Sequence, residues 1–316
     1  MRTRKLGWTD LDLTTVGLGT WAIGGTWAYG WGPQDDKQSI GTIVSAVKSG
    51  INWIDTAPVY GLGHSEEIAG EAIRQCSTKP FVATKCGTFA DESGKGLHPM
   101  HAHEIKRDCE LSLTRLRVET IDLYQIHWPN PDELVEEAWG AIAELVGQGK
   151  VRYGGVSNFS VQQLERIRPI HPVASLQPPY SMLRRDAEGE LLGYCAEHEI
   201  GVICYSPMQK GILTDKFTRS WVESLAEDDH RRAHDKNFRD PQLARNLKVV
   251  EGLKEVARAQ GISVAQLAVA WVLRRPEVTA AIAGARKPEQ IRETVAAGDV
   301  DLPQEALETV ERLLSA

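Results

Sequence analysis

The sequence predicts an α/β fold in which eight parallel strands close into a (β/α)8 TIM barrel. Eight short apolar runs each end in a small or polar residue, and a helix-like stretch follows nearly every run. The chain has 316 residues, which suits one barrel of about 250 residues with insertions, so we expect residues 1–316 to form a single domain. The strands are expected at residues 15–19, 51–54, 81–84, 121–126, 151–156, 173–176, 202–204 and 280–283.

An N-terminal β-hairpin is expected before the barrel, over residues 4–15, because a glycine and an aspartate separate two short extended pieces there. We expect this hairpin to plug the floor of the barrel. The first strand is followed by residues 19–34, which hold three tryptophans and many glycines. This composition predicts a flexible wall with large apolar faces.

Helices are expected between the strands. Residues 36–50 carry Ile40, Ile43, Val44 and Val47 at helical spacing and end at a glycine. Regularity breaks at residues 206–241, where a long charged loop after the seventh strand has little apolar periodicity, and loops of this length usually form lids or are disordered. Further helices are expected at residues 64–75, 103–117, 131–149, 160–168, 189–199, 242–259, 263–275, 288–298 and 303–316.

Composition disfavours several classes of partner. The formal net charge is −7 with no dense Lys/Arg tract, which argues against a nucleic-acid surface. No apolar run approaches the roughly 20 residues that span a bilayer, and the N-terminus has no signal-peptide core. The five cysteines are scattered and odd in number. They predict reduced thiols and a cytoplasmic location.

Four chemistry-bearing side chains follow consecutive strands: Asp55, Tyr60, Lys85 and His127. In a barrel the strand C-termini meet at one mouth. A tyrosine alone is a poor acid, with a free pKa of about 10, but a neighbouring ammonium lowers that pKa. A carboxylate would hold the lysine, and a histidine can donate to a substrate oxygen. Together they suit proton donation to a carbonyl oxygen that becomes an alcohol.

Each of these residues alone has a simpler interpretation. Tyr60 could be an amphipathic surface residue, and Asp55 could cap a turn. Lys85 could be a surface charge, and His127 could be a core histidine. The coincidence of all four at consecutive strand ends favours the site.

Segments along nearly the whole chain resemble the signatures of the aldo-keto reductase superfamily, most closely its bacterial general-stress and inositol-catabolism type members. They read IDTAPVYGLGHSEEIAGEAI, ATKCG, IDLYQIHWP, GGVSNFS, SLQPPYSML, YSPMQKGILT and AGARKPEQIRET. The resemblance implies reduction of small-molecule aldehydes or ketones with a nicotinamide nucleotide, which supplies the hydride. It also implies that Tyr60 is the general acid, Lys85 lowers the Tyr60 pKa, Asp55 pairs with Lys85, and His127 orients the carbonyl.

The resemblance further implies a set of cofactor-binding residues, from the nicotinamide to the adenosine end of the nucleotide. An arginine near the adenosine ribose can take a 2′-phosphate by bidentate hydrogen bonds, so Arg286 favours NADPH/NADP+ over NADH; the alternative is a solvated loop charge. Thr294 and Ala285 stand where many members have Asn and Ser. The implied residues are Gly19, Thr20, Trp21 and Asp55; Ser157, Asn158, Gln177 and Tyr205; Ser206, Pro207, Gly211 and Leu213; and Gly284, Arg286, Gln290 and Glu293.

Two other functions remain as alternatives. One is a cofactor-binding sensor or regulatory subunit with slow chemistry, like the channel β-subunits. The other is a barrel hydrolase with a histidine-bound metal, since barrels host many chemistries. His98, His101 and His103 lie close in sequence, but no carboxylate or cysteine ligand set accompanies them, so we expect no metal. The physiological substrate and the oligomeric state are left open.

Overall fold

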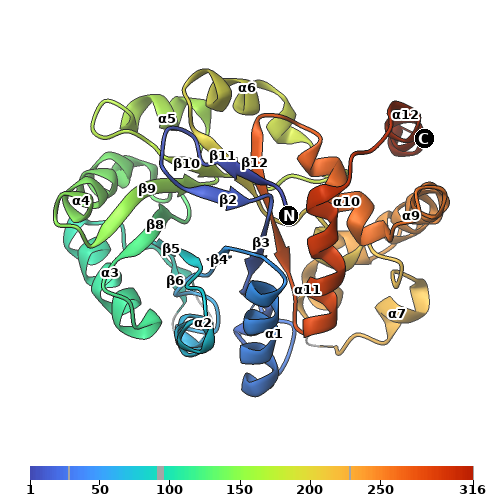
Figure 1. Ribbon diagram of the computed structural model, residues 1–316, viewed down its shortest axis with the longest axis horizontal. Coiled ribbons are helices and arrows are strands. Elements are labelled where there is room, and N and C mark those ends of the chain that lie inside the picture. The colour runs from blue at the N-terminus through green and yellow to red at the C-terminus, as the bar shows by residue number, and fades with distance from the viewer. Residues whose placement is uncertain (28, 91–95, 228, 316) are drawn as a thin grey trace.

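Eight parallel strands form a closed barrel in the computed structural model, which describes residues 1–27, 29–90, 96–227 and 229–315 (Figure 1). Each strand pairs with the next along the chain, and the last strand returns to the first through the register Gly284 to Gly19. The predicted barrel is thereby confirmed. Its strands are β3 (Val16–Gly19), β4 (Trp53–Asp55), β5 (Phe81–Cys86), β8 (Ile121–Ile126), β9 (Val151–Ser157), β10 (Ser175–Gln177), β11 (Gly201–Cys204) and β12 (Val278–Gly284).

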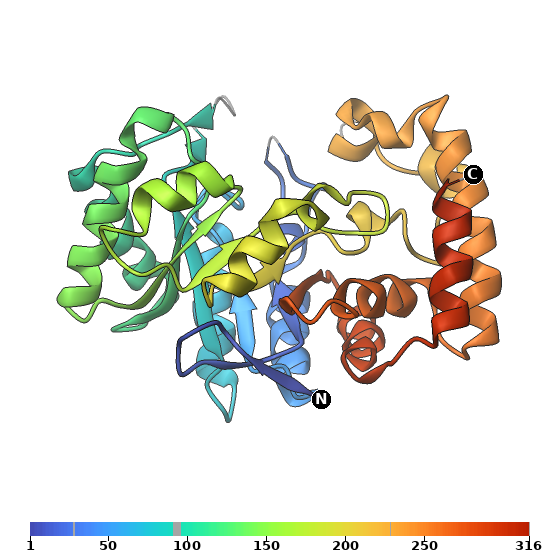
Figure 2. The ribbon, with the colours of Figure 1, turned by 90° about the horizontal axis from the view of Figure 1, so that it is seen from above.

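Helices surround the barrel and cover its apolar outer face (Figure 1). The helix α10 (Val264–Leu273) is buried along its length apart from Gln266, and Ser263 caps its first turn as expected. The last helix, α12 (Gln304–Ser315), lies alongside α9 (Gln242–Ala259) at the edge of the molecule (Figure 2). The other helices that follow strands are α1 (Asp36–Lys48), α2 (His64–Gln75), α3 (Ala102–Leu116), α4 (Val135–Gly147), α5 (Val161–Ile167), α6 (Glu190–Glu197), α9 (Gln242–Ala259), α11 (Pro288–Val295) and α12 (Gln304–Ser315).

The N-terminal hairpin, β1 (Thr3–Lys5) and β2 (Asp12–Thr14), closes the floor of the barrel as predicted. Its leucines pack with Trp53 and with other inward-facing side chains of the strands. At Gly7 the backbone has φ +53°, and a Cβ there would lie 2.2 Å from the Glu199 carbonyl oxygen, so only glycine fits. In Figure 2 the hairpin (dark blue) lies at one end of the barrel, and the segment around α7 (Arg219–Glu223, light orange) lies towards the other end.

The segment 206–241 is more ordered than its sequence predicts. Two short helices lie within it, α7 (Arg219–Glu223) and α8 (His230–His234), and Thr218 and Asp229 cap their first turns. Two 3-10 turns, η4 (Gln209–Gly211) and η5 (Lys236–Phe238), flank them. A small hairpin, β6 (Phe89–Ala90) with β7 (Gly96–Leu97), was also not predicted. These elements line the barrel mouth.

All five cysteines are free and buried, as reduced thiols would be. Burial raises the pKa of each of them, for example that of Cys109 to about 12.

Among the described residues, no helix taken singly has the length and apolar character to cross a bilayer; α9 and α10 meet that criterion only as a pair bent by 85°.

Candidate active site

Lys85 lies inside the barrel and is the centre of the candidate site. Its ammonium is fully buried and donates to Asp55 Oδ1 at 2.7 Å, to the Thr56 carbonyl oxygen at 2.9 Å and to Tyr60 Oη at 3.2 Å. An ammonium has three protons, so these partners use all of them. Asp55 ends β4, and Lys85 lies on the neighbouring β5. The structure therefore brings together three of the four residues predicted to act in catalysis.

The Tyr60 phenol has a free proton to offer. Its oxygen accepts from Lys85, and within the described residues no acceptor for its own proton lies at hydrogen-bond distance. Two tryptophan rings pack beside it, with centroids at 5.1 Å for Trp21 and 6.2 Å for Trp27. Tyr60 is only 5% exposed, so little of it is in contact with water.

The net shift of the Tyr60 pKa is set by burial, so the predicted lowering of this pKa by Lys85 stays a prediction. Burial raises the Tyr60 pKa well above its ordinary value, and the negative charge of Asp55 raises it further. Burial also lowers the Lys85 pKa, although Asp55 opposes this effect. Tyr60 is therefore a protonated phenol across the ordinary pH range.

His127 follows β8 and presents its ring edge to Tyr60 at a centroid distance of 5.9 Å. Burial lowers the His127 pKa well below its ordinary value, and the charge of Lys85 adds to this. The imidazole is therefore neutral and carries one N–H donor. Nδ1 is buried and has no hydrogen-bond partner among the described residues, and such orphaned atoms call for an explanation. The fourth predicted residue thus lies at the same site.

Two glutamine amides complete the surroundings of Asp55. Gln177, at the end of β10, donates to Asp55 Oδ2 at 2.8 Å, and Gln125 on β8 lies 3.5 Å from the same oxygen. The two amides also contact each other at 3.2 Å. Sequence reasoning missed Gln125 because it lies within an apolar run; its signal was a buried polar residue in alternation with apolar ones.

The residues expected at the nicotinamide carboxamide lie together at the ends of β9 to β11. Asn158 has φ +63°, its amide donates to the His127 carbonyl oxygen at 3.0 Å, and its Oδ1 accepts from the Tyr205 hydroxyl at 2.9 Å. Ser157 Oγ donates to the Gln177 carbonyl oxygen at 2.8 Å. These contacts fix polar groups on the side of the mouth opposite β4.

The carboxyl ends of β3 and β12 lie side by side in the barrel. Gly19 and Gly284 are direct neighbours there, and a Cβ at Gly284 would meet only the Gly19 carbonyl oxygen, at 4.0 Å. A Cβ at Gly19 would instead lie 2.6 Å from the Ile282 side chain. Thr20 is buried and donates through its hydroxyl to the Asp55 carbonyl oxygen at 3.1 Å.

The segments after β11 and β12 bring charged side chains of both signs together. The predicted residues Ser206, Pro207, Gly211 and Leu213 belong to the first of these segments. Ser206 and Gly211 have positive φ, while Pro207 and Leu213 are buried. Arg231 covers the Trp31 ring at 4.3 Å and pairs with Asp229 at 2.7 Å. Burial lowers the Lys216 pKa, the charge of Arg231 lowers it further, and the charge of Glu293 raises it. Arg286 and Lys287 also lower the Lys216 pKa. Sequence reasoning did not single out Lys216 or Arg231.

Arg286 is held by the loop after β3 and is not a solvated loop charge. Its guanidinium donates to Gln34 Oε1 at 2.6 Å and to the Trp31 carbonyl oxygen at 3.0 Å. Gln290 accepts from the Arg286 backbone at 2.8 Å. Glu293 is exposed, and only its backbone carbonyl is engaged, by Gln266.

No group of three His, Cys, Asp or Glu side chains placed to hold a metal occurs in the described part of the chain. His101 and His103 stack at 6.0 Å, and His101 contacts Glu137.

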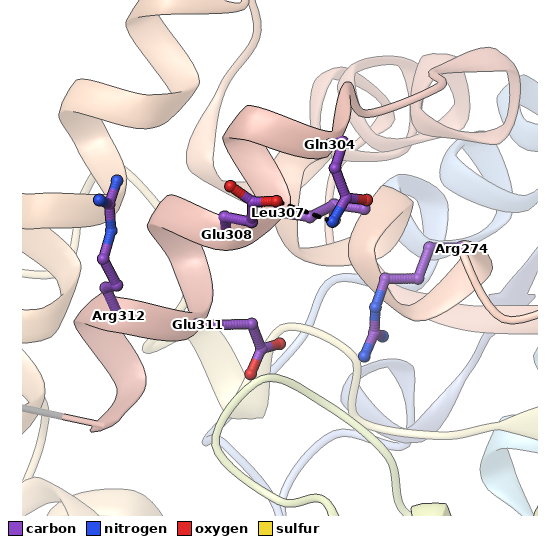
Figure 3. Close-up of a pocket in the computed structure, with 6 residues that line it drawn as sticks. All are labelled: Arg274, Gln304, Leu307, Glu308, Glu311 and Arg312. Atoms are coloured by element: carbon purple, nitrogen blue, oxygen red, sulfur yellow. Dashed lines mark hydrogen bonds between the residues drawn. The ribbon is translucent and has the colours of Figure 1, made fainter.

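A hollow of about 450 Å³ lies away from the strand ends, between α10 and α12 (Figure 3). It is lined by Arg274, Gln304, Leu307, Glu308, Glu311 and Arg312, so it is separate from the mouth.

Comparison with known proteins identifies the family. The model of the aldo/keto reductase family matches residues 15–315. The aldo-keto reductase YhdN of Bacillus subtilis (strain 168) is 41% identical over 286 residues, which cover 90% of this chain and 84% of that protein. A protein of Escherichia coli (strain K12) named NADH-specific methylglyoxal reductase is 33% identical over 335 residues, covering 99% of this chain and 100% of that one.

The fold comparison agrees. The structure of a glycerol dehydrogenase from Gluconobacter oxydans matches with a TM-score of 0.90 and 39% identity, covering 99% of this chain and 95% of that one. A barrel with a buried lysine, carboxylate and phenol at its mouth suits the chemistry of these enzymes. The chain belongs to the aldo/keto reductase family and is an oxidoreductase that reduces carbonyl compounds.

Proposed function

We propose that residues 1–316 act as one domain that reduces a small-molecule aldehyde or ketone to an alcohol, with Tyr60 as the proton donor. The observation that carries this proposal is the hydrogen-bond arrangement around Lys85. The ammonium donates to Tyr60 Oη and is itself fixed by Asp55 and Thr56. Because Tyr60 Oη accepts from Lys85, the hydroxyl proton is free to be donated to a substrate oxygen.

The raised Tyr60 pKa is compatible with this role. Carbonyl reduction develops an alkoxide, which is more basic than a phenolate, so a neutral phenol is the form that can deliver a proton. As the proton leaves Tyr60, negative charge develops on its oxygen 3.2 Å from the Lys85 ammonium. A fixed cation in a dry site stabilises such charge strongly. The neutral His127 imidazole can donate to the same substrate oxygen from the ring edge that faces Tyr60.

The residues at the mouth fit a nicotinamide nucleotide, which supplies the hydride when it is bound. Gly284 has no side chain and is exposed at the end of β12, and Tyr205 follows the neighbouring β11, where its ring would stack on the nicotinamide. Asn158 and Gln177 carry amide groups that now bond within the protein and would exchange these partners for a carboxamide. These contacts support the cofactor site and are also consistent with a cofactor-binding sensor, from which only turnover distinguishes it.

We favour NADP(H) over NADH on the basis of charge. Four basic residues, Lys216, Arg231, Arg286 and Lys287, and two acidic ones, Asp229 and Glu293, influence one another in the segments after β11 and β12. The excess of basic side chains suits the added negative charge of a 2′-phosphate. A phosphate would replace the loop acceptors that Arg286 now contacts. The Escherichia coli relative is named as NADH-specific, so a comparison of both nucleotides belongs in any test.

Tyr60→Phe tests the central role. The variant loses only the hydroxyl, so carbonyl reduction falls about 10²- to 10⁴-fold, while the affinity for NADPH stays within a factor of two or so of wild type. Steady-state turnover of an aldehyde panel and a fluorescence titration with NADPH and NADH measure the two quantities. Tyr194→Phe, which removes a hydroxyl bonded to Arg168 on the outside of the barrel, is the matched control. Wild-type turnover by Tyr60→Phe would remove this residue from the mechanism.

A further inference from the structure

The first turn of α2 carries a buried serine that joins two strand ends. Ser65 is fully buried, and its Oγ lies 2.8 Å from Thr20 Oγ1 and 3.1 Å from Thr56 Oγ1. Thr20 follows β3 and Thr56 follows β4. One hydroxyl of α2 therefore contacts the chain just beyond two neighbouring strands, next to the Thr56 carbonyl oxygen that accepts from Lys85.

The next residue of α2 is a buried carboxylate with a different pair of partners. Glu66 is fully buried. Its Oε1 accepts from the Thr84 hydroxyl at 2.6 Å, and its Oε2 accepts from Arg115 Nε on α3 at 2.6 Å. Thr84 directly precedes Lys85 in β5, and alternation along a strand directs these two side chains to opposite faces. Glu66 thus holds β5 from outside at the point where Lys85 enters the barrel.

The same turn of α2 also fixes the backbone of Tyr60. The Ser65 amide donates to the Tyr60 carbonyl oxygen at 3.2 Å. The residues between them turn sharply, with positive φ at Gly61, Leu62 and Gly63. A Cβ at Gly61 would lie 2.0 Å from the Gly24 carbonyl oxygen, so the turn is packed closely on its other side. Tyr60 has little freedom to move unless α2 moves with it.

We propose that Ser65 and Glu66 are positioning residues that set the contact between Tyr60 and Lys85. They tie the helix that follows Tyr60 to three consecutive strands, at Thr20, Thr56 and Thr84. The inference rests on the proposed proton-donor role of Tyr60. A contact between two reacting groups is sensitive to position, and a displacement of 1 Å can cost about a hundredfold in rate.

The negative charge of Glu66 has a second effect, on Lys85. Burial lowers the Lys85 pKa, while Asp55 on β4, Glu66 on α2 and Tyr205 after β11 raise it. His127 after β8 is kept neutral by its own burial and by Lys85, and Tyr60 is a neutral phenol. Removing the Glu66 charge therefore lowers the Lys85 pKa. Lys85 then loses its charge at a lower pH. Because the proposed proton transfer depends on this charge, the fall of kcat at alkaline pH (the alkaline limb of the pH profile) moves to lower pH.

Three variants separate position from charge. Glu66→Gln removes the charge, so kcat falls at least about fivefold and the alkaline limb shifts. Thr84→Val removes only the hydroxyl, so kcat falls while the limb stays in place. Thr84→Ser keeps the hydroxyl and restores kcat. Glu67→Gln is the matched control, because Glu67 lies in the same helical turn with its side chain 61% exposed, and it behaves as wild type.

The readouts are kcat from pH 6 to 10 per folded molecule, the Kd for NADPH by fluorescence, and the melting temperature of each holoenzyme. The inference is supported if Glu66→Gln and Thr84→Val both lower kcat without changing the Kd for NADPH, and if only Glu66→Gln shifts the alkaline limb. Wild-type kcat in Thr84→Val, or an unshifted limb in a folded Glu66→Gln, overturns it. If Glu66→Gln does not fold, the Thr84→Val and Thr84→Ser pair decides. Full activity of Tyr60→Phe would instead refute the proposed function, so the two failures are distinguishable.

Discussion

Replacing Lys85 by Met removes the cation on which both Asp55 and Tyr60 depend. The Asp55 carboxylate stays buried, with only the amides of Gln177 and Gln125 near Oδ2. A buried charge that loses its partner typically costs 3–5 kcal/mol, here about 3 kcal/mol in the free energy of unfolding because the amides remain. At the same time Tyr60 loses a hydrogen bond from a charged donor, worth about 1.5–3 kcal/mol. A loss of that size in the transition state lowers kcat by roughly 10- to 150-fold.

The double variant Asp55→Asn with Lys85→Met separates these two effects. Both charges are gone, so urea denaturation shows most of the lost stability restored, while aldehyde reduction stays as slow as in Lys85→Met. Lys106→Met is the control, because Lys106 pairs with Glu144 on the surface, and such pairs contribute about 0–1 kcal/mol. Recovery of turnover together with stability in the double variant would refute a direct role of Lys85 in the proton transfer.

Three further predictions concern the cofactor, the outer layer and the floor. Arg286→Ala raises the KM for NADPH about tenfold or more with little change for NADH, and equal changes for both nucleotides would place the 2′-phosphate elsewhere; Arg292→Ala, at an exposed site on α11, is the control. Burial raises the Asp108 pKa to about 7, so the native state binds a proton that the unfolded state releases. Wild-type stability therefore falls between about pH 4 and pH 7, and Asp108→Asn flattens this fall by up to roughly 4 kcal/mol in urea titrations; a parallel profile would contradict it. Gly7→Ala lowers the free energy of unfolding by more than about 1 kcal/mol because its Cβ meets the Glu199 carbonyl oxygen, while kcat per folded molecule is unchanged; wild-type melting would argue against the plug.

The barrel was predictable because buried parallel strands are continuous apolar runs. All eight expected strands agree with the structure within two residues at each end. The short helices α7 and α8 were missed because five residues are too few to show helical periodicity. Only their capping residues, Thr218 and Asp229, left a signal in the sequence.

The convergence of Asp55, Tyr60, Lys85 and His127 followed from their places at strand ends. The raised Tyr60 pKa did not follow, because it depends first on burial and then on the charge of Asp55, and the degree of burial is set by the fold. Gln125 lies within a strand, and its contact with Asp55 depends on which face of β8 it occupies. Lys216 and Arg231 come from a segment without periodicity, so only the fold brings them near Arg286 and Lys287.

The five cysteines give the native protein an unusual chemical inertness. Each thiol is enclosed and its raised pKa keeps it from forming a thiolate, which is the species that peroxides and alkylating reagents attack. Native enzyme should therefore tolerate handling without a reductant. Maleimide labelling would proceed only when the fold opens around each thiol, so the five sulfurs can report where and how fast the native structure opens.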